Sequence, residues 1–288
     1  RSTGDIDQLS GAMGTLSGPG GVSIPAEAVR VRFCGYVPVD ETMTMTADPL
    51  LEQPSVEVSA NLAQPLWITV AVPGDAAAGN YSGKFTANAT PGGNVEFDVK
   101  LEVLPAVLAP ATDWKFYLNI WQDPAGAGRA HGGEPWGDEH WKLLEKYAAN
   151  FAAHGMKSIM TSIVEEPWHS QAGVAYPSRV KRSYPGQFKP GAADKFEWDF
   201  SIFDRYVSLM VEAGIKDKID MYALVKGPGG TLDASILYRD TSTGEMSEVE
   251  LEVGEPLWEE IWTAFLPVLR QHLEEKGWFD IAMLGFDE

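Results

Sequence analysis

The feature that most constrains the fold is a unit of helix, glycine and strand that recurs three times in the second half of the chain. In each unit an amphipathic segment ends at a glycine and an apolar run follows; the glycines are Gly155, Gly214 and Gly277. Glycine commonly ends helices because it adopts the left-handed conformation without strain. With another apolar run at 114–121, the pattern predicts four parallel strands joined by right-handed helical crossovers.

The predicted elements can be bounded from their apolar periods and breakers. One helix is capped by Asp138 and runs to His154, one starts near Ser201, and one opens at Pro256 with a kink at Pro267. The strands are expected at 114–121, 156–164, 219–225 and 279–286, with a hairpin near Thr241–Gly244.

Two architectures fit this alternation: a doubly wound open sheet, or the first half of an eight-stranded (β/α)8 barrel of the TIM type. No glycine-rich phosphate turn follows any strand, so the nucleotide-binding open sheet lacks its signature. The long connections all follow strands, as expected for the active face of a barrel. We therefore predict a partial barrel over 114–288, truncated after its fourth strand.

The first part of the chain follows a different pattern, with short period-two runs separated by proline, glycine and asparagine. This pattern predicts an antiparallel β-sandwich over 21–104. Residues 1–20 are rich in glycine and serine and are expected to be a loose start, and 105–113, with two prolines, are expected to be an extended linker. The alternating runs lie at 29–33, 56–58, 66–72, 81–87 and 95–103.

Charge and composition exclude several function classes. The 288-residue chain has a net charge of −19, which argues against a nucleic-acid partner because such a partner needs a basic face. No apolar run is long enough to cross a bilayer, so no membrane insertion is expected. Cys34 is the single cysteine, and the five scattered histidines show no metal-ligand spacing, so no metal site is predicted.

Two Asp-Glu pairs are candidates for acid-base chemistry, and their positions separate them. Asp138-Glu139 begins a helix, where acidic side chains cap free N–H groups. Asp287-Glu288 ends an apolar strand, where a barrel carries its catalytic side chains. Because neighbours on a regular strand point to opposite faces, both carboxylates can reach one ligand only if the strand bends there. We predict Asp287 and Glu288 as the catalytic pair.

Aromatic residues near strand ends are candidates for sugar contacts. A flat apolar ring matches a sugar face, and Trp121, Trp136 and Trp168 lie at or after predicted strand ends. For each alone, packing is the more common role, whereas three such rings on one face would form a sugar-binding platform. His169, in the Pro-interrupted segment 165–169, is a loop residue with either a substrate contact or a plain surface role.

The order and spacing of several short motifs resemble glycoside hydrolase family 123. The resemblance covers nearly the whole chain, from the sandwich to the final Asp-Glu pair. The motifs are Gln64–Val70, Gly79–Gly83, Leu118–Gln122, Pro135–His140, Ile163–Trp168, Phe200–Asp204, Leu273–Phe279 and Asp287-Glu288. In the family the barrel continues beyond its Asp-Glu pair, so the resemblance implies that this chain spans only the first half.

The resemblance implies a retaining, exo-acting β-N-acetylgalactosaminidase that uses substrate-assisted catalysis and no cofactor. Asp287 would orient the acetamido group of a glycan's terminal N-acetylhexosamine, and Glu288 would act as acid and then base. Adjacent carboxylates can divide these roles because each raises the other's proton affinity. Such a substrate implies export to the periplasm or cell exterior. The oligomeric state stays open.

Two alternatives remain at this point. One is a non-catalytic carbohydrate-binding or surface protein built on the same barrel. The other is a glycosidase of the same build with a different sugar preference.

Overall fold

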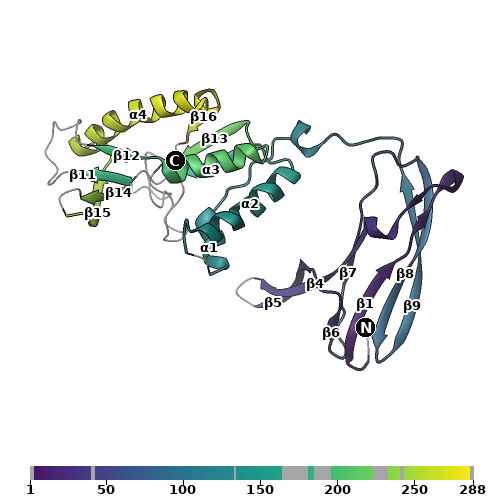
Figure 1. Cartoon of the computed structure of the whole chain (residues 1–288). Helices are drawn as coiled ribbons and strands as arrows, with labels where there is room; N and C mark the ends of the chain where they lie inside the picture. Colours follow the sequence, from purple (N-terminus) through teal and green to yellow (C-terminus); the bar gives the residue numbers. More distant parts are fainter. Residues whose placement is uncertain are drawn as a thin grey trace. The chain divides into compact units, whose positions relative to one another are not determined.

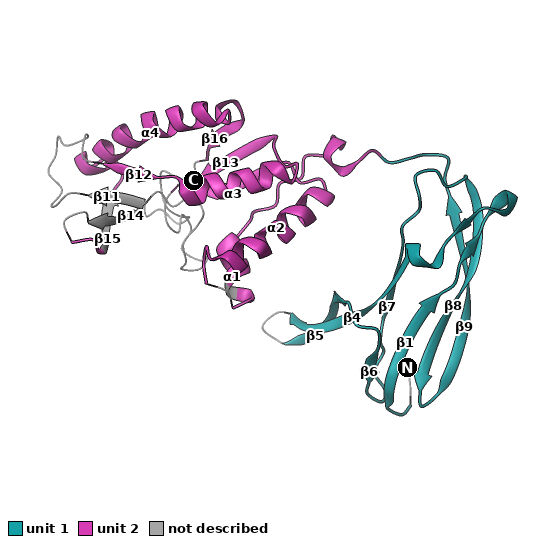
Figure 2. Cartoon of the chain, viewed as in Figure 1, with its two compact units in different colours: residues 1–108 teal, residues 109–288 magenta. Residues whose placement is uncertain are grey.

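The chain divides into two compact units, Arg1–Leu108 and Ala109–Glu288 (Figure 2). The computed structural model describes residues 3–39, 43–132, 134–163, 181–184, 196–222, 233–240 and 243–285. The division between the units falls inside the segment expected to be a linker, where Val107 and Leu108 are 77% and 84% exposed. In the described residues no helix is both long and apolar enough to cross a membrane.

The first unit consists of two antiparallel sheets (Figure 1). The larger sheet contains β1 (Ile6–Met13), β2 (Leu16–Ser17), β3 (Ser23–Ile24), β6 (Val56–Val58), β8 (Gly79–Thr90) and β9 (Gly93–Val103). The smaller contains β4 (Val29–Val39), β5 (Thr44–Leu51) and β7 (Leu66–Val70). Their facing side chains form a core around Leu16, Tyr81 and Phe85, and all five predicted strands are present.

The expectation of a loose start over 1–20 is wrong, because residues 6–13 form a strand inside the larger sheet. β1 pairs with β8 from Gln8 to Met13 and with β6 on its other side. Its small residues are required by packing: a Cβ at Gly11 would come within 3.0 Å of side-chain atoms of Phe85, Leu66 and Val31. The glycine content that predicted a flexible segment reflects close packing of this strand against its neighbours.

The second unit is built on a parallel sheet in the order β10-β13-β16. Its strands are β10 (Ser158–Ser162), β13 (Lys218–Tyr222) and β16 (Ala282–Leu284), and its helices are α1 (Pro124–Ala130), α2 (Asp138–Ala153), α3 (Ser201–Glu212) and α4 (Pro256–Lys276). The three repeated glycines follow α2, α3 and α4 with φ of 78°, 104° and 72°. The chain is therefore a two-unit protein, rich in strands, with its described α-helices in the second unit.

One face of the parallel sheet carries the core of the second unit. Ile159 of β10, and Ile219 and Met221 of β13, belong to one buried cluster with residues of α2, α3 and α4. The alternate residues of β13, including Asp220 and Tyr222, point to the other face because strand side chains alternate. A doubly wound sheet carries helices on both faces, whereas these three helices share one cluster with one set of strand residues.

Two excursions from the parallel sheet join in a second, four-stranded sheet, β12-β11-β14-β15. β11 (Lys181–Tyr184) and β12 (Glu197–Asp199) lie between β10 and α3, and β14 (Asp233–Asp240) and β15 (Met246–Glu252) lie between β13 and α4. β14 and β15 form the predicted hairpin, and β11 pairs with β14 in parallel. Because both excursions follow strand ends, this sheet belongs to the carboxyl side of the parallel sheet.

Two predicted parallel strands are shorter than expected. The strand at 114–121 is reduced to one bridge between Leu118 and Met156, and the one at 279–286 begins as a 3₁₀ turn before β16. At the first site the Gln122 amide replaces further backbone pairing. It donates to the Ser158 carbonyl (3.2 Å) and accepts from the Met160 N–H (2.8 Å). These backbone groups of β10 are therefore hydrogen-bonded by a side chain and not by a neighbouring strand.

Candidate functional site

The carboxyl ends of the parallel strands meet at one edge of the second unit. β10 is extended past Ser162 by a hydrogen bond from the Ile163 N–H to the Tyr222 carbonyl, 2.5 Å long, and the Gly285 N–H donates to the Met221 carbonyl at 2.8 Å. The edge therefore carries Tyr222 at the end of β13 and Gly285 directly after β16. This edge is where a parallel α/β protein places its ligands.

The predicted catalytic pair follows Gly285 in the sequence by two and three residues. Asp287 and Glu288 themselves lie outside the described residues, as do Trp168 and His169. Their roles therefore stay predictions. Gly285, two residues before Asp287, lies within the described residues, as do Trp121 and Trp136.

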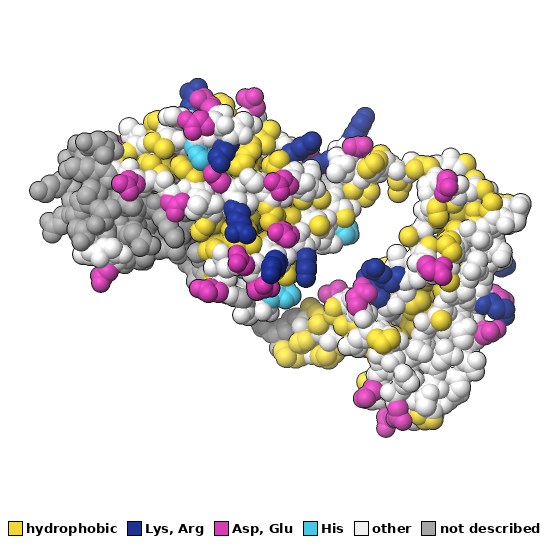
Figure 3. Space-filling view, in the orientation of Figure 1, with side chains coloured by type: hydrophobic (Ala, Val, Ile, Leu, Met, Phe, Trp, Pro, Cys, Tyr) yellow, Lys and Arg dark blue, Asp and Glu magenta, His cyan; other side chains and the backbone are white. Residues whose placement is uncertain are grey.

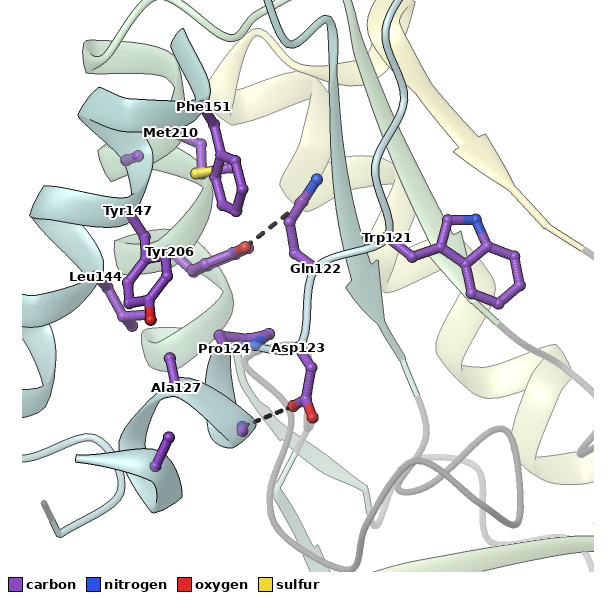
Figure 4. Close-up of a pocket in the computed structure, with 13 residues that line it drawn as sticks. Trp121, Gln122, Asp123, Pro124, Ala127, Leu144, Tyr147, Phe151, Tyr206 and Met210 are labelled. Carbon is purple, nitrogen blue, oxygen red and sulfur yellow. Dashed lines mark hydrogen bonds between the residues drawn. The ribbon is translucent and has the colours of Figure 1, made fainter. Parts of the chain in front are cut away.

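Trp121 lies at the candidate site, next to Tyr222. Its ring is 49% exposed, and its centroid lies 5.9 Å from that of Tyr222 at an interplanar angle of 47°. In Figure 4 the Trp121 ring lies on the opposite side of its segment from Gln122 and Tyr206. A half-exposed indole braced by a second aromatic ring at the strand edge fits the predicted sugar contact.

Trp136 is held in a different environment, against the start of α2. Its ring packs on His140 and Trp141 with centroid separations of 5.0 and 5.6 Å. The backbone N–H of Trp136 donates to His140 Nδ1 at 2.9 Å, and the backbone carbonyl of Trp136 accepts from Trp141 Nε1 at 2.9 Å. The backbone at Trp136 is left-handed, with φ of 64°. These contacts favour the packing role over the sugar-contact role weighed for this residue.

His140 joins the first two helices and was not singled out by its sequence position. Nδ1 accepts the Trp136 N–H, so the proton must sit on Nε2, which donates to the Pro124 carbonyl at 2.8 Å. The ring is 2% exposed, and Gly128 of α1 leaves it room, since a Cβ there would lie 3.0 Å from Nε2. His140 therefore fixes the start of α1, just after Trp121.

Gln122 anchors the same segment from the other side and is also a residue that sequence reasoning passed over. Besides its contacts to β10, its Nε2 donates to the Ile120 carbonyl at 2.6 Å and its Oε1 accepts from the Tyr206 hydroxyl at 3.4 Å. Burial, with the nearby negative charge of Asp123, raises the pKa of Tyr206 and keeps its hydroxyl protonated. The only sequence signal was a polar residue directly after an apolar run.

A cavity of about 340 Å³ adjoins these residues, between the 121–124 segment and the helices (Figure 4). Asp123 caps α1 from its rim, accepting the Gly126 N–H at 2.7 Å. The remaining lining is mostly apolar: Pro124, Ala127, Leu144, Tyr147, Phe151 and Met210. The Gln122 amide and the Tyr206 hydroxyl bond to each other, and Gln122 also bonds to backbone, so these polar groups position the 121–124 segment.

A buried ionic contact lies on the same face of β13 as Tyr222, the face away from the helices, and it involves the two residues of that face that precede Tyr222. Asp220 is 5% exposed; it accepts from Lys218 at 3.0 Å and from Asn119 at 3.3 Å. The hydrogen bond to Asp220 raises the pKa of Lys218. The contact ties the segment before Trp121 to β13. Among the described residues, no group of three His, Cys, Asp or Glu side chains could hold a metal ion.

Comparison with known proteins identifies related sequences for both units. The catalytic-domain model of glycoside hydrolase 123 matches residues 121–288, and the glycoside hydrolase 123 N-terminal-domain model matches residues 1–89. No curated protein sequence matches. A solved structure of a family 123 glycoside hydrolase from Clostridium perfringens, described as revealing details of glycolipid glycan hydrolysis, superimposes with a TM-score of 0.82 at 23% identity. The match covers 98% of this chain and 50% of that one.

Proposed function

The chain belongs to glycoside hydrolase family 123, and from this premise we propose that the protein removes terminal β-linked N-acetylgalactosamine from glycans. The observation that carries the proposal is positional. In the second unit, Asp287-Glu288 is the Asp-Glu pair that does not begin a helix. In the sequence it comes three and four residues after the end of β16, and the neighbouring strand β13 ends with Tyr222 beside Trp121. The solved relative's reported action on glycolipid glycans supports a glycan substrate.

We propose that the parallel sheet is the first part of a (β/α)8 barrel. Three helices share one cluster with one face of the sheet, as in a barrel, where helices form an outer ring. The Leu118–Met156 bridge adds a fourth parallel segment beside β10. In this arrangement the face with Asp220 and Tyr222 is the barrel interior, and the carboxyl edge is its active end.

The proposed mechanism uses the substrate's own acetamido group as the nucleophile, an exception to the usual pair of flanking carboxylates. The acetamido oxygen attacks the anomeric carbon and forms an oxazolinium ring. As the bond to the leaving oxygen breaks, Glu288 gives that oxygen a proton. Asp287 accepts a hydrogen bond from the acetamido N–H and stabilises the positive charge. Glu288 then takes a proton from water, which opens the ring with net retention.

The first test is release of the aryl group from an aryl β-N-acetylgalactosaminide by the full-length gene product. Asp287→Asn and Glu288→Gln should each lower kcat by about 10²–10⁴-fold, the range for general acid-base groups. A substrate with a trifluoroacetamido group should react far more slowly, because fluorine weakens the carbonyl oxygen as a nucleophile. An unchanged rate with that substrate would argue against acetamido participation.

The alternatives are separated by the same assay. A folded full-length protein that binds the sugar but never releases it would support the carbohydrate-binding reading. Faster release from another aryl glycoside than from the N-acetylgalactosaminide would keep a glycosidase and change its sugar preference. Asp138→Asn is the matched control, because this acidic residue begins α2 and is expected to leave kcat unchanged.

A further inference from the structure

We infer that Tyr222 is a positioning residue for the Asp287-Glu288 pair. Its ring, braced by Trp121, lies over the backbone of Gly285 and sets the direction in which the chain leaves β16. The inference rests on the proposed function, because it takes the pair as catalytic. It concerns one residue of β13 and one directly after β16, for which the reaction itself requires no role.

The register of β13 and β16 brings the two residues together. Asp220 pairs with Met283 and Met221 with Leu284, and the Gly285 N–H continues the ladder to the Met221 carbonyl at 2.8 Å. Gly285 is therefore the next residue beside Tyr222. Because Met221 points into the helix-side core, Tyr222 points to the opposite face, the one that the proposed barrel encloses.

Gly285 is glycine because the Tyr222 ring occupies the space a side chain would need. A Cβ at residue 285 would overlap three ring atoms of Tyr222, the nearest being Cε1 and the others Cδ1 at 2.6 Å and Cζ at 2.8 Å. Gly285 is not among the glycines with positive φ. Close approach, and not left-handed backbone, therefore explains the glycine at this position.

The Tyr222 ring is itself fixed by its neighbours. Trp121 contacts it at 5.9 Å between centroids, and Gln122 anchors the Trp121 segment to β10 through the Ser158 carbonyl and the Met160 N–H. A chain of contacts thus runs from β10 to the backbone two residues before Asp287. Because the Tyr222 ring crowds the backbone two residues before Asp287, we expect the ring to limit where that carboxylate can point.

The experiment is a double-mutant cycle on the full-length protein with the aryl β-N-acetylgalactosaminide. Gly285→Ala should lower kcat on the order of 100-fold with little change in KM, since a displacement of about 1 Å can cost that much. In a Tyr222→Ala background the same change should cost less than about 3-fold, because the ring it would meet is gone. Tyr222→Phe keeps the three ring atoms and should retain kcat within about 5-fold.

Matched controls separate positioning from loss of folding. A Cβ at Gly74 meets nothing within 4 Å, and Tyr117 is 48% exposed, so Gly74→Ala and Tyr117→Ala should leave kcat and Tm unchanged. A positioning role also predicts a changed pH profile of kcat/KM in Gly285→Ala at an unchanged Tm. If Gly285→Ala lowers Tm and kcat together and the losses add in the cycle, the inference is wrong.

The outcomes distinguish this inference from the proposed function. Turnover that collapses in Asp287→Asn but survives in Gly285→Ala and Tyr222→Ala would keep the hexosaminidase and overturn the positioning role. No turnover by the folded wild-type protein would overturn both. Turnover with the expected non-additive cycle would support both, and would assign the glycine after β16 to the catalytic geometry.

Discussion

The two units of this chain solve the same packing problem in different ways. In the first unit the facing sheets bury a small cluster around Tyr81 and Phe85, and apolar side chains gather on the surface of the hairpin formed by β4 and β5 (Figure 3). In the second unit three helices bury an aromatic-rich cluster against one sheet face. Buried polar groups, Gln122 and His140 among them, fix its backbone where strand pairing stops.

The two units differ in which interactions fix the position of the backbone. Backbone ladders hold much of the first unit, so we expect its exposed side chains to change at little cost. In the second unit, the segment that leads to Trp121 is joined to the neighbouring strand by an isolated bridge, Leu118–Met156. There, the Gln122 amide and the His140 ring supply the missing hydrogen bonds. A side chain used in this way is specific in length and shape, and we expect its neighbourhood to tolerate few substitutions.

The largest contrast in stability should come from one residue type placed in the two units. Phe203 is 2% exposed in the helix core, and Phe97 is 54% exposed on β9. Phe203→Ala should lower the free energy of unfolding by about 3–5 kcal/mol, the cost of removing a buried aromatic ring. Phe97→Ala should cost less than about 1 kcal/mol. Urea unfolding of both variants measures the contrast, and equal losses would contradict it.

A second contrast compares two glutamines that bond to backbone carbonyls. Gln122 is buried and serves both Ser158 and Met160 of β10, whereas Gln64 bonds to the Cys34 and Pro65 carbonyls from a partly buried site. Gln122→Leu should cost about 2–4 kcal/mol, because buried backbone groups lose their partners. Gln64→Leu should cost about 1 kcal/mol, since water can replace it. Similar midpoints in urea would show that Gln122 is no anchor.

Much of the second unit could be predicted from the sequence because its signals are local. The helix periods, the glycines at 155, 214 and 277 and the hairpin between β14 and β15 depend on residues near one another in the chain. The short first strand could not be predicted, because Gln122 meets β10 across 36 residues. β1 was missed for a similar reason: the neighbours that require Gly11 come from β4, β7 and β8.

The candidate site also contains residues with local sequence signals and residues that depend on contacts between distant segments. Asp287 and Glu288 could be proposed from an apolar run that ends on two acids, which is a local pattern. Trp121 followed from its place after a predicted strand. Tyr222 and Gly285 gave no such signal, because their importance lies in the register of β13 against β16. Residues that position a site depend on contacts between strands, and a single sequence does not display those contacts.

The missed strand gives a third prediction, at a glycine. Gly11→Ala should lower the free energy of unfolding by about 1–3 kcal/mol, because the new methyl group would come within 3.0 Å of Phe85, Leu66 and Val31, closer than van der Waals contact. Gly74→Ala is the control, with open space around its Cβ, and should change stability by less than about 0.5 kcal/mol. Equal unfolding curves for the two variants would contradict the close packing of β1 in the first unit.

The smallest expected effect concerns charged contacts in each unit. Asp204 of α3 accepts from His272 and Lys276 of α4, both at 2.6 Å, and its side chain is 24% exposed. Lys84 of β8 reaches Glu96 of β9 at 3.0 Å from an exposed position. Exposed pairs gain little because water screens them, whereas partial burial and shared hydrogen bonds strengthen the first contact.

Lys276→Met should therefore cost about 0.5–1 kcal/mol, and Lys84→Met should produce no resolved change in the unfolding midpoint. Raising the salt concentration should reduce the Lys276 effect only in part, because a partly buried pair is screened less than an exposed one. Hydrogen exchange at the ends of α3 and α4 would locate the loss, since the Asp204 contacts join these two helices. A larger loss from Lys84→Met would mean that charge pairs, and not ladders alone, hold the sheets of the first unit.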